Sequence, residues 1–235
     1  MSARPVIFCA IDTPHLNRAV ELAKIVGPVT GGLKLGLEFF CSHGPQGVEK
    51  VREACPSADI FLDLKFHDIP HTVASVVRSV SESLAPTYLN VHASGGEEMM
   101  DAAKAACAKP TKLLAVTILT SLNKGILAIF QPDRETLSLE KQVLFLGILS
   151  SLCELDGVVC SGHEIEMIRR EKEIKKDFIL MVPGIRPEGS DQNDQKRVMT
   201  PKEALQKGAT HLVIGRPITG APDPALAARE ILDTL

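Results

Sequence analysis

The stretch IFLDLKFHDIPHTVASVVRSVSESL, residues 60–84, decides the fold. Its opening part, residues 60–65, is an apolar run with charged side chains at alternate positions near its end, which predicts a strand. From His71 onward apolar side chains recur at helical spacing, which predicts a helix over 71–84. A strand that leads into a helix is the unit from which parallel sheets are built.

The same unit repeats along the whole chain. Strands are predicted at 6–11, 29–35, 60–65, 88–92, 113–118, 157–160, 178–182 and 211–214, and helices at 14–26, 46–55, 71–84, 97–108, 139–152, 164–171, 201–207 and 222–235. Eight units of about 29 residues each fit an α/β fold of the (β/α)8 TIM-barrel class, whose usual length is about 250 residues. No GxGxxG or GxxxxGK motif follows the first strand, which disfavours an open doubly wound sheet. We therefore expect a single TIM-barrel domain over residues 1–235.

Composition narrows the class of protein further. Of the 235 residues, 45% are hydrophobic and 23% charged, which is typical of a globular protein, and the formal net charge is −3. Such a charge provides no basic face for a phosphate backbone, so we expect no nucleic-acid partner. The first apolar run is too short for a signal peptide or a membrane span, so we expect a cytoplasmic protein with no membrane partner. The six cysteines form no CxxC pair and are expected to be reduced, mostly buried residues.

Charged side chains stand where two predicted strands end. Lys34 ends the second strand, and Asp63 and Lys65 lie on one face of the third. In a barrel this is the mouth, where active sites are built, and two inward charges are costly unless they are paired. Asp68 follows three residues later, so the sequence offers an alternating array of Lys34, Asp63, Lys65 and Asp68.

Structural roles for these residues stay open at this point. Asp68, before Ile69-Pro70, would also serve as the N-cap of the next helix, and Lys34 could reach into solvent. His67 and His71 could suggest a metal, but Pro70 lies between them at a strand-to-helix corner, so a metal site is disfavoured.

Two glycine- and arginine-containing segments follow the last two strands. They are Pro183-Gly184-Ile185-Arg186-Pro187 and Gly215-Arg216-Pro217. TIM barrels often bind phosphate with the loops after these strands, and arginine offers a planar fork of donors to an oxyanion. Arg216 is therefore the predicted phosphate ligand, the alternative being a surface arginine bonded to nearby carbonyls. Residues 121–138 and 183–200 are too long for plain connections, and no function is assigned to 123–138.

Residues 61–70, FLDLKFHDIP, resemble the DxKxxDIP signature of the orotidine 5'-phosphate decarboxylase family. Further segments resemble that family along nearly the whole chain: Ala10-Ile11-Asp12, Lys34-Leu35-Gly36, Asn90-Val91-His92-Ala93, Leu119-Thr120-Ser121, Pro183-Gly184-Ile185-Arg186-Pro187, Asp194-Gln195 and Gly215-Arg216. DxKxxD alone is shared with related sugar-phosphate decarboxylases and synthases that use Mg²⁺. The Ile-Pro, Leu-Thr-Ser and Gly-Ile-Arg segments select the orotidylate member.

The resemblance implies decarboxylation of orotidine 5'-monophosphate to uridine 5'-monophosphate and CO₂ in de novo pyrimidine synthesis, with no cofactor and no metal. It implies that Lys65 protonates the pyrimidine carbon, and that Lys34, Asp63 and Asp68 complete the charged array. It also implies a homodimer in which Asp68 and Thr72 enter the site from the neighbouring subunit. The implied substrate-binding residues are Asp12, Lys34 and Thr72 at the ribose, Thr120 and Ser121 at the base, and Arg186, Gln195, Gly215 and Arg216 at the phosphate, with Pro183 beside them.

The chemistry is consistent with such residues. Loss of CO₂ leaves an electron pair on a ring carbon, and an ammonium at Lys65 could stabilise that charge and then protonate it. We further hypothesise that phosphate binding at Arg216 and at the segment 183–200 drives a closure that expels water and completes the charged array.

Three other hypotheses for the function stay open. A metal-dependent sugar-phosphate lyase or epimerase would lose activity in EDTA. A non-enzymatic sensor of phosphate ligands would more naturally have lost one of the four charged residues. Schiff-base aldol chemistry at Lys65 needs a neutral amine, which nearby carboxylates disfavour, and borohydride trapping would reveal it.

Overall fold

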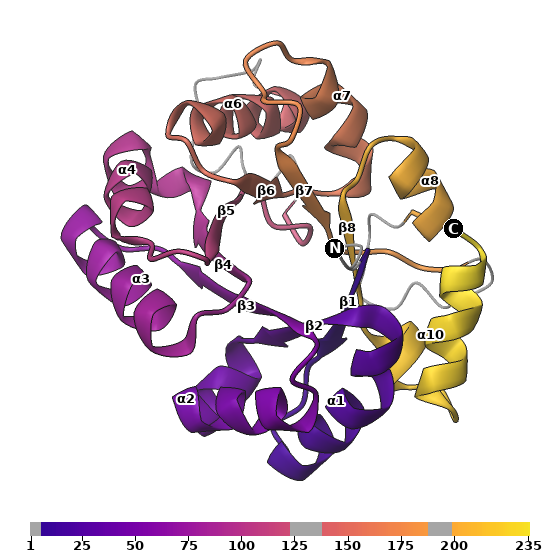
Figure 1. Cartoon of the computed structure of the whole chain (residues 1–235). Helices are drawn as coiled ribbons and strands as arrows, with labels where there is room; N and C mark the ends of the chain where they lie inside the picture. Colours follow the sequence, from indigo (N-terminus) through magenta and orange to yellow (C-terminus); the bar gives the residue numbers. More distant parts are fainter. Residues whose placement is uncertain (1–5, 123–137, 188–198) are drawn as a thin grey trace.

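Eight parallel strands close a barrel, as predicted for the TIM-barrel class (Figure 1). The computed structural model describes residues 6–122, 138–187 and 199–235. The strands are β1 (Ile7–Ile11), β2 (Gly31–Gly36), β3 (Asp59–Phe66), β4 (Tyr88–His92), β5 (Lys112–Val116), β6 (Gly157–Val159), β7 (Ile179–Val182) and β8 (His211–Ile214). Each strand pairs with its neighbour in sequence, and β1 pairs with β8 to close the ring.

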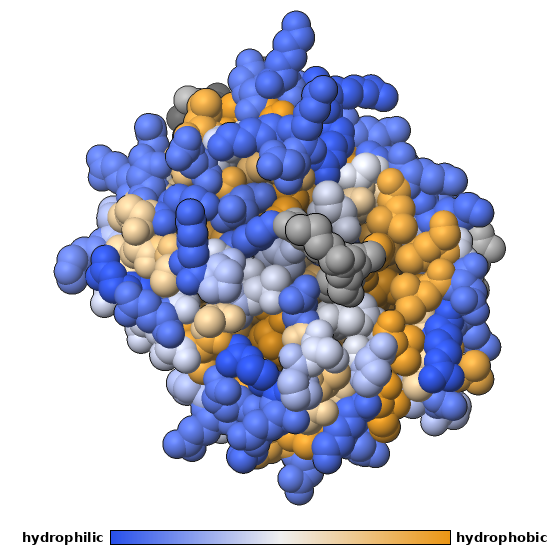
Figure 2. All heavy atoms as spheres, viewed as in Figure 1, coloured by the Kyte–Doolittle hydropathy of each residue, from blue (hydrophilic) through white to orange (hydrophobic). Residues whose placement is uncertain are grey.

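Helices surround the strands on the outside of the ring (Figure 1). They are α1 (Leu16–Thr30), α2 (Leu37–Ala54), α3 (Pro70–Leu84), α4 (Glu97–Ala106), α6 (Leu139–Leu152), α7 (Ile165–Arg170), α8 (Pro201–Gln206), α9 (Arg216–Thr219) and α10 (Pro224–Asp233), with 3-10 turns η1 (Ala93–Gly95) and η2 (Gly162–Glu164). Hydrophilic side chains dominate the periphery of the face in view, and hydrophobic ones show in patches inside it (Figure 2). None of the helices in the described ranges has the length and apolar character needed to cross a membrane.

The core has two layers, one between strands and helices and one inside the barrel. The inner layer is centred on Phe8, Phe61 and Tyr88, which meet edge to face with ring centroids 5.4–6.4 Å apart. Gly32 of β2 makes room for them, because a Cβ there would lie 2.8 Å from the Phe8 ring. Burial of aromatic side chains of this size contributes about 1.5–3 kcal/mol each. The inside of the barrel below its mouth is therefore filled by packed, largely apolar side chains, which support the side chains at the carboxyl ends of the strands.

The predicted strands and most predicted helices are found with small shifts at their ends. The largest difference is α2, which begins at Leu37 instead of residue 46, because a helical run precedes the break at Gly44 (φ 58°, ψ −158°) and Pro45. Helix α8 begins at the predicted residue 201, and Thr200 caps it together with Glu203. All six cysteines are free and four are buried.

The starts of α1 and α3 differ from the predicted ones by one or two residues. Helix α1 begins at Leu16, not Pro14, and its N-cap position holds His15, while the Asp12 carboxylate accepts a hydrogen bond from Lys34. The N-cap position of α3 is Ile69 rather than Asp68. Asp68 instead accepts a hydrogen bond from the adjacent Ile69 N–H at 2.7 Å.

Candidate active site

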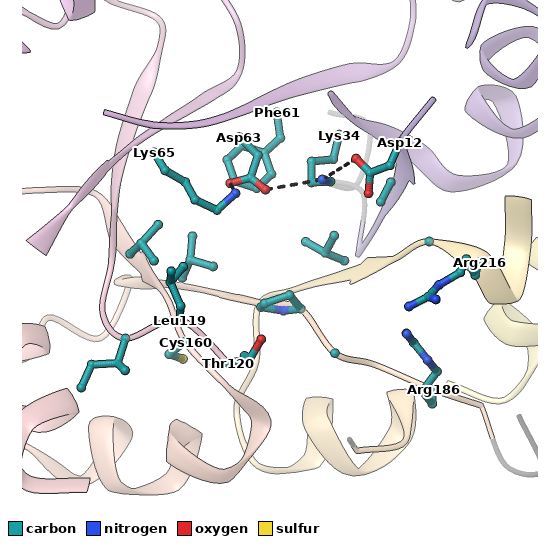
Figure 3. A pocket seen from close by; sticks show the side chains of 18 of the residues that line it. Asp12, Lys34, Phe61, Asp63, Lys65, Leu119, Thr120, Cys160, Arg186 and Arg216 are labelled. Carbon is teal, nitrogen blue, oxygen red and sulfur yellow. Dashed lines mark hydrogen bonds and ion pairs between the residues drawn. The ribbon is translucent and has the colours of Figure 1, made fainter. Parts of the chain in front are cut away.

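A cavity of about 510 Å³ opens at the carboxyl ends of the strands. Its polar lining falls into two groups that lie apart (Figure 3). In the first group, Asp12 directly follows β1, Lys34 belongs to β2, and Asp63 and Lys65 belong to β3. Pro183, Arg186, Gly215 and Arg216 come from the segments that follow β7 and β8.

Four of the predicted charged residues form one continuous chain of ion pairs (Figure 3). The Nζ of Lys34 lies 2.9 Å from Oδ1 of Asp12 and 3.4 Å from Oδ2 of Asp63. The other oxygen of Asp63 lies 2.8 Å from Nζ of Lys65. Asp63 thus stands between two ammonium groups, and positive and negative charges alternate along the chain.

Burial and pairing act in opposite directions on these groups. Burial by itself lowers the pKa of Lys34, but Asp63 and then Asp12 raise it above its ordinary value. Burial by itself raises the pKa of Asp63, yet Lys34 and then Lys65 hold it below its ordinary value. The Lys34 ammonium and the Asp63 carboxylate are therefore both charged at neutral pH although both are buried.

The close approach of Lys34 to Asp12 depends on the glycine that ends β2. A Cβ at Gly36 would lie 3.0 Å from Oδ1 of Asp12 and 3.2 Å from Nζ of Lys34. A larger residue at this position would push the pair apart. The sequence around Gly36 does not indicate this role, because the role depends on the Asp12 side chain, which follows a neighbouring strand.

The end of β3 is not a regular strand. Lys65 has φ +51°, in the left-handed region that residues with a Cβ seldom adopt. Its backbone N–H donates to Oδ1 of Asn90 at 2.7 Å, and Nδ2 of Asn90 donates to Oδ1 of Asp63 at 2.7 Å. The predicted alternation still places Asp63 and Lys65 toward the cavity, while Leu62 and Leu64 pack in the outer core.

Arg186 and Arg216 point toward each other at the far end of the cavity (Figure 3). Arg186 is only 8% exposed, and within the described part of the chain its Nε has no hydrogen-bond partner. Burial and then the neighbouring Arg216 lower its pKa. The Arg186 backbone N–H donates to the Met199 carbonyl at 3.0 Å, which ties the two described ends of this segment together. Such a buried donor beside a second cation is suited to bind an anion.

Other parts of the cavity have an apolar wall. It includes Val116, Ile118, Leu119, Val159 and Val213, which belong to β5, β6 and β8 or follow β5. Such a wall lowers the local polarity and strengthens the electrostatic interactions at the charged array.

The other predicted site residues have different positions. Thr120 lines the cavity, whereas Ser121 is exposed and does not. Asp68 is exposed and Thr72 half-buried, and neither lines the cavity of its own chain. Gln195 and residues 123–137 lie outside the described residues.

His67 and His71 are both exposed, and no set of three or more metal-ligating side chains gathers anywhere within residues 6–122, 138–187 and 199–235. His67 instead lies against His92, with ring centroids 5.4 Å apart. Burial and then His67 lower the pKa of His92.

Two residues of the site were not assigned from the sequence as functional. Gly36 and Asn90 were noted only as part of the family resemblance, although Asn90 is fully buried and contacts both Asp63 and Lys65. An amide in the middle of a buried parallel strand is the signal that could have identified it.

Comparisons with known proteins agree with this geometry. Residues 5–231 match the family described as "Orotidine 5'-phosphate decarboxylase / HUMPS family". Similar proteins named orotidine 5'-phosphate decarboxylase include those of Sphingopyxis alaskensis, 46% identical over 97% of this chain and 98% of the relative, and Rhodospirillum rubrum, 48% identical over 98% and 94%. A crystal structure of orotidine 5'-phosphate decarboxylase from Lactobacillus acidophilus superposes with a TM-score of 0.81, at 33% identity and covering 98% of both chains.

Proposed function

The chain belongs to the orotidine 5'-phosphate decarboxylase / HUMPS family, and from that membership we propose that it decarboxylates orotidine 5'-monophosphate to uridine 5'-monophosphate. The observation that carries this proposal is the ion-pair chain ending in Lys65, in a cavity whose opposite end holds two arginines. The reaction belongs to de novo pyrimidine synthesis, as the sequence resemblance implies.

The phosphate of the nucleotide binds at Arg186 and Arg216. The buried Arg186 guanidinium, whose Nε has no partner among the residues that the structure describes, gains charge-assisted hydrogen bonds when a phosphate binds. This end of the cavity orients the nucleotide so that its pyrimidine lies toward β3, with Thr120 at the base and Asp12 and Lys34 at the ribose.

The chemical step needs one proton donor. The bond between the ring carbon and the carboxylate breaks, CO₂ leaves, and the electron pair stays on the carbon. The Lys65 ammonium stabilises that pair and then gives it a proton, which forms the new C–H bond and leaves a neutral amine that regains its proton from water. Asp63, 2.8 Å away, holds the ammonium in place.

Part of the catalysis comes from groups away from Lys65. Enzymes lower barriers by up to roughly 20 kcal/mol, and a single general acid contributes typically about 10²- to 10⁴-fold in rate. Binding energy at the phosphate end is available to hold the pyrimidine against the charged array, so that some of it appears only in the transition state.

The active enzyme is a homodimer in this proposal. Asp68 and Thr72 stand directly after β3 and in the first turn of α3, outside the cavity of their own chain. Exposed Ile69, with 67% of its surface accessible, lies beside them and offers apolar area to a second copy. Asp68 of the partner then adds a second carboxylate to the array around Lys65.

The direct test mixes purified protein with orotidine 5'-monophosphate in excess EDTA and follows formation of uridine 5'-monophosphate. We expect turnover by the wild-type protein and a loss of several orders of magnitude in Lys65→Ala. Activity that needs an added divalent cation would instead favour the metal-dependent sugar-phosphate lyases on the same barrel, and equal rates in Lys65→Ala would remove that residue from the mechanism.

A further inference from the structure

Asn90 lies opposite a break in the pairing of β3 with β4. Leu62 pairs with Leu89 and Phe66 pairs with Val91, so three residues of β3, namely 63–65, stand opposite Asn90 alone. A regular parallel ladder would place a single residue there. The extra residues remove the ordinary backbone pairing at the point where the chain delivers both Asp63 and Lys65 to the cavity.

The Asn90 side chain replaces the missing pairing. Its Oδ1 accepts from the Lys65 backbone N–H at 2.7 Å, and its Nδ2 donates to Oδ1 of Asp63 at 2.7 Å. The orientation of the amide is determined by these partners, since a backbone N–H can only donate and a carboxylate can only accept. Asn90 is fully buried, so water does not compete for either bond.

The two bonds reach the two ends of one side chain. The first holds the backbone of Lys65, whose φ of +51° needs support from its surroundings. The second holds the same Asp63 oxygen that lies 2.8 Å from Nζ of Lys65. The Asn90 amide thus holds Lys65 at both ends, directly at its backbone N–H and through Asp63 at its ammonium.

We propose that Asn90 is a positioning residue for the decarboxylation, which joins the backbone of Lys65 to the carboxylate of Asp63 and so sets where the ammonium stands. Asn90 does not line the cavity and acts on the reaction through these two neighbours. The inference rests on the proposed function, because it assigns Lys65 the transfer of the proton.

Asn90→Leu removes both hydrogen bonds at nearly constant volume. Because misplacement of a catalytic group by about 1 Å can cost roughly 10²-fold, we expect kcat to fall by about 10- to 100-fold. KM and the dissociation constant for uridine 5'-monophosphate should stay within about twofold, since the arginines that hold the phosphate are untouched. Asn90→Asp keeps the acceptor for the Lys65 N–H but loses the donor to Asp63 and adds a like charge, so its kcat should fall at least as far.

A matched control lies at the other end of the same two strands. Thr87, which precedes β4, donates from Oγ1 to Oδ1 of Asp59 at the start of β3, at 2.9 Å. Thr87→Val removes this side-chain link between the two strands without touching the cavity, and should leave kcat within about twofold. A loss in Thr87→Val equal to that in Asn90→Leu would show that loosening of β3 against β4 is sufficient, and would overturn the inference.

Hydrogen exchange gives a readout that is independent of turnover. The Lys65 amide should exchange at least tenfold faster in Asn90→Leu, whereas the Leu113 amide, which donates to Asp156 at 2.8 Å, should not change. Faster exchange with unchanged kcat would show that the contact has no part in catalysis. If Asn90→Leu does not fold, as judged by circular dichroism, Asn90→Asp carries the test. A wild-type protein that never converts orotidine 5'-monophosphate would instead refute the proposed function, and is thereby distinguished from a failure of Asn90 alone.

Discussion

Replacing Arg186 by methionine should weaken the binding of phosphate-bearing ligands and leave the stability of the free protein almost unchanged. Most buried arginines would behave in the opposite way, because their hydrogen bonds to carbonyls hold the fold together. Arg186 is different because it is 8% exposed, its Nε has no partner in the described part of the chain, and Arg216 stands beside it.

The effect on binding follows from the bonds that a phosphate would accept. A hydrogen bond to a charged group contributes about 1.5–3 kcal/mol, so loss of one or two amounts to roughly 2–5 kcal/mol. At about 1.4 kcal/mol per tenfold, affinity for uridine 5'-monophosphate should fall by about 30-fold to a few thousand-fold. Affinity for uridine, which has no phosphate, should not change.

The effect on the free energy of unfolding is small because a lost hydrogen bond is offset by the removal of unfavourable interactions. Methionine loses the bond from Nη1 to the Ile185 carbonyl at 2.9 Å, worth about 1.5–3 kcal/mol. It also removes the Nε donor, which has no partner among residues 6–122, 138–187 and 199–235; such a buried unpaired donor costs about 1–3 kcal/mol. The repulsion from Arg216 is removed as well. We expect the free energy of unfolding to change by no more than about 2 kcal/mol.

Calorimetric titration with the two ligands and urea unfolding measure both quantities. Arg169→Met is the matched control, since Arg169 bonds to the carbonyls of Gly208 at 2.9 Å and Phe178 at 2.8 Å, away from the cavity. It should lose stability and keep its affinity for the nucleotide. The reasoning fails if Arg186→Met behaves like this control, with unfolding made easier by more than about 3 kcal/mol and nucleotide affinity unaltered.

Three further outcomes are expected. Orotidine, which lacks the phosphate, should lose kcat as well as affinity, and an unchanged rate at saturation would separate phosphate binding from the chemical step. If the partner supplies Asp68, Lys65→Ala and Asp68→Ala are each inactive alone, but an equal mixture should regain about a quarter of the wild-type activity after subunit exchange. Half of the dimers are then hybrids, and each hybrid has one intact site out of two. No recovery would place Asp68 elsewhere. Acidification should destabilise the protein through Asp63, because its pKa is lower in the folded than in the unfolded state. The stability that this difference contributes is complete above the ordinary pKa of about 4 and is lost as the pH falls through the folded value. In urea unfolding, Asp63→Asn should therefore be less sensitive to acid than the wild type, and equal sensitivity would contradict the pairing.

Features of the site that follow from the alternation of side chains along one strand could be predicted from the sequence. Alternation along β3 is enough to send Asp63 and Lys65 to one side, and the end of β2 is enough to place Lys34 at the mouth. Closure of the barrel then brings these neighbouring strands together, and the ion pairs form between side chains at their carboxyl ends.

Features that depend on a second strand could not be predicted. Nothing in the sequence around Asp12 identifies the partner of its carboxylate, which is the buried Lys34, 22 positions away. The function of Gly36 is visible only once that pair is in place. The break opposite Asn90 likewise depends on how β3 pairs with β4, which no single segment encodes.

The arrangement around Asp63 bears on what this carboxylate can do in the proposed reaction. Three groups donate to it, namely Lys34, Lys65 and Asn90, and they use both of its oxygens. A carboxylate near an incoming substrate carboxylate could relieve the repulsion by rotating away or by taking a proton. Rotation would break three bonds at once, and the same donors hold its pKa below the ordinary value, so both routes are costly. In the proposed reaction, any repulsion that the substrate carboxylate meets at this end of the cavity would be relieved by departure of CO₂, and the electron pair that remains would face the Lys65 ammonium.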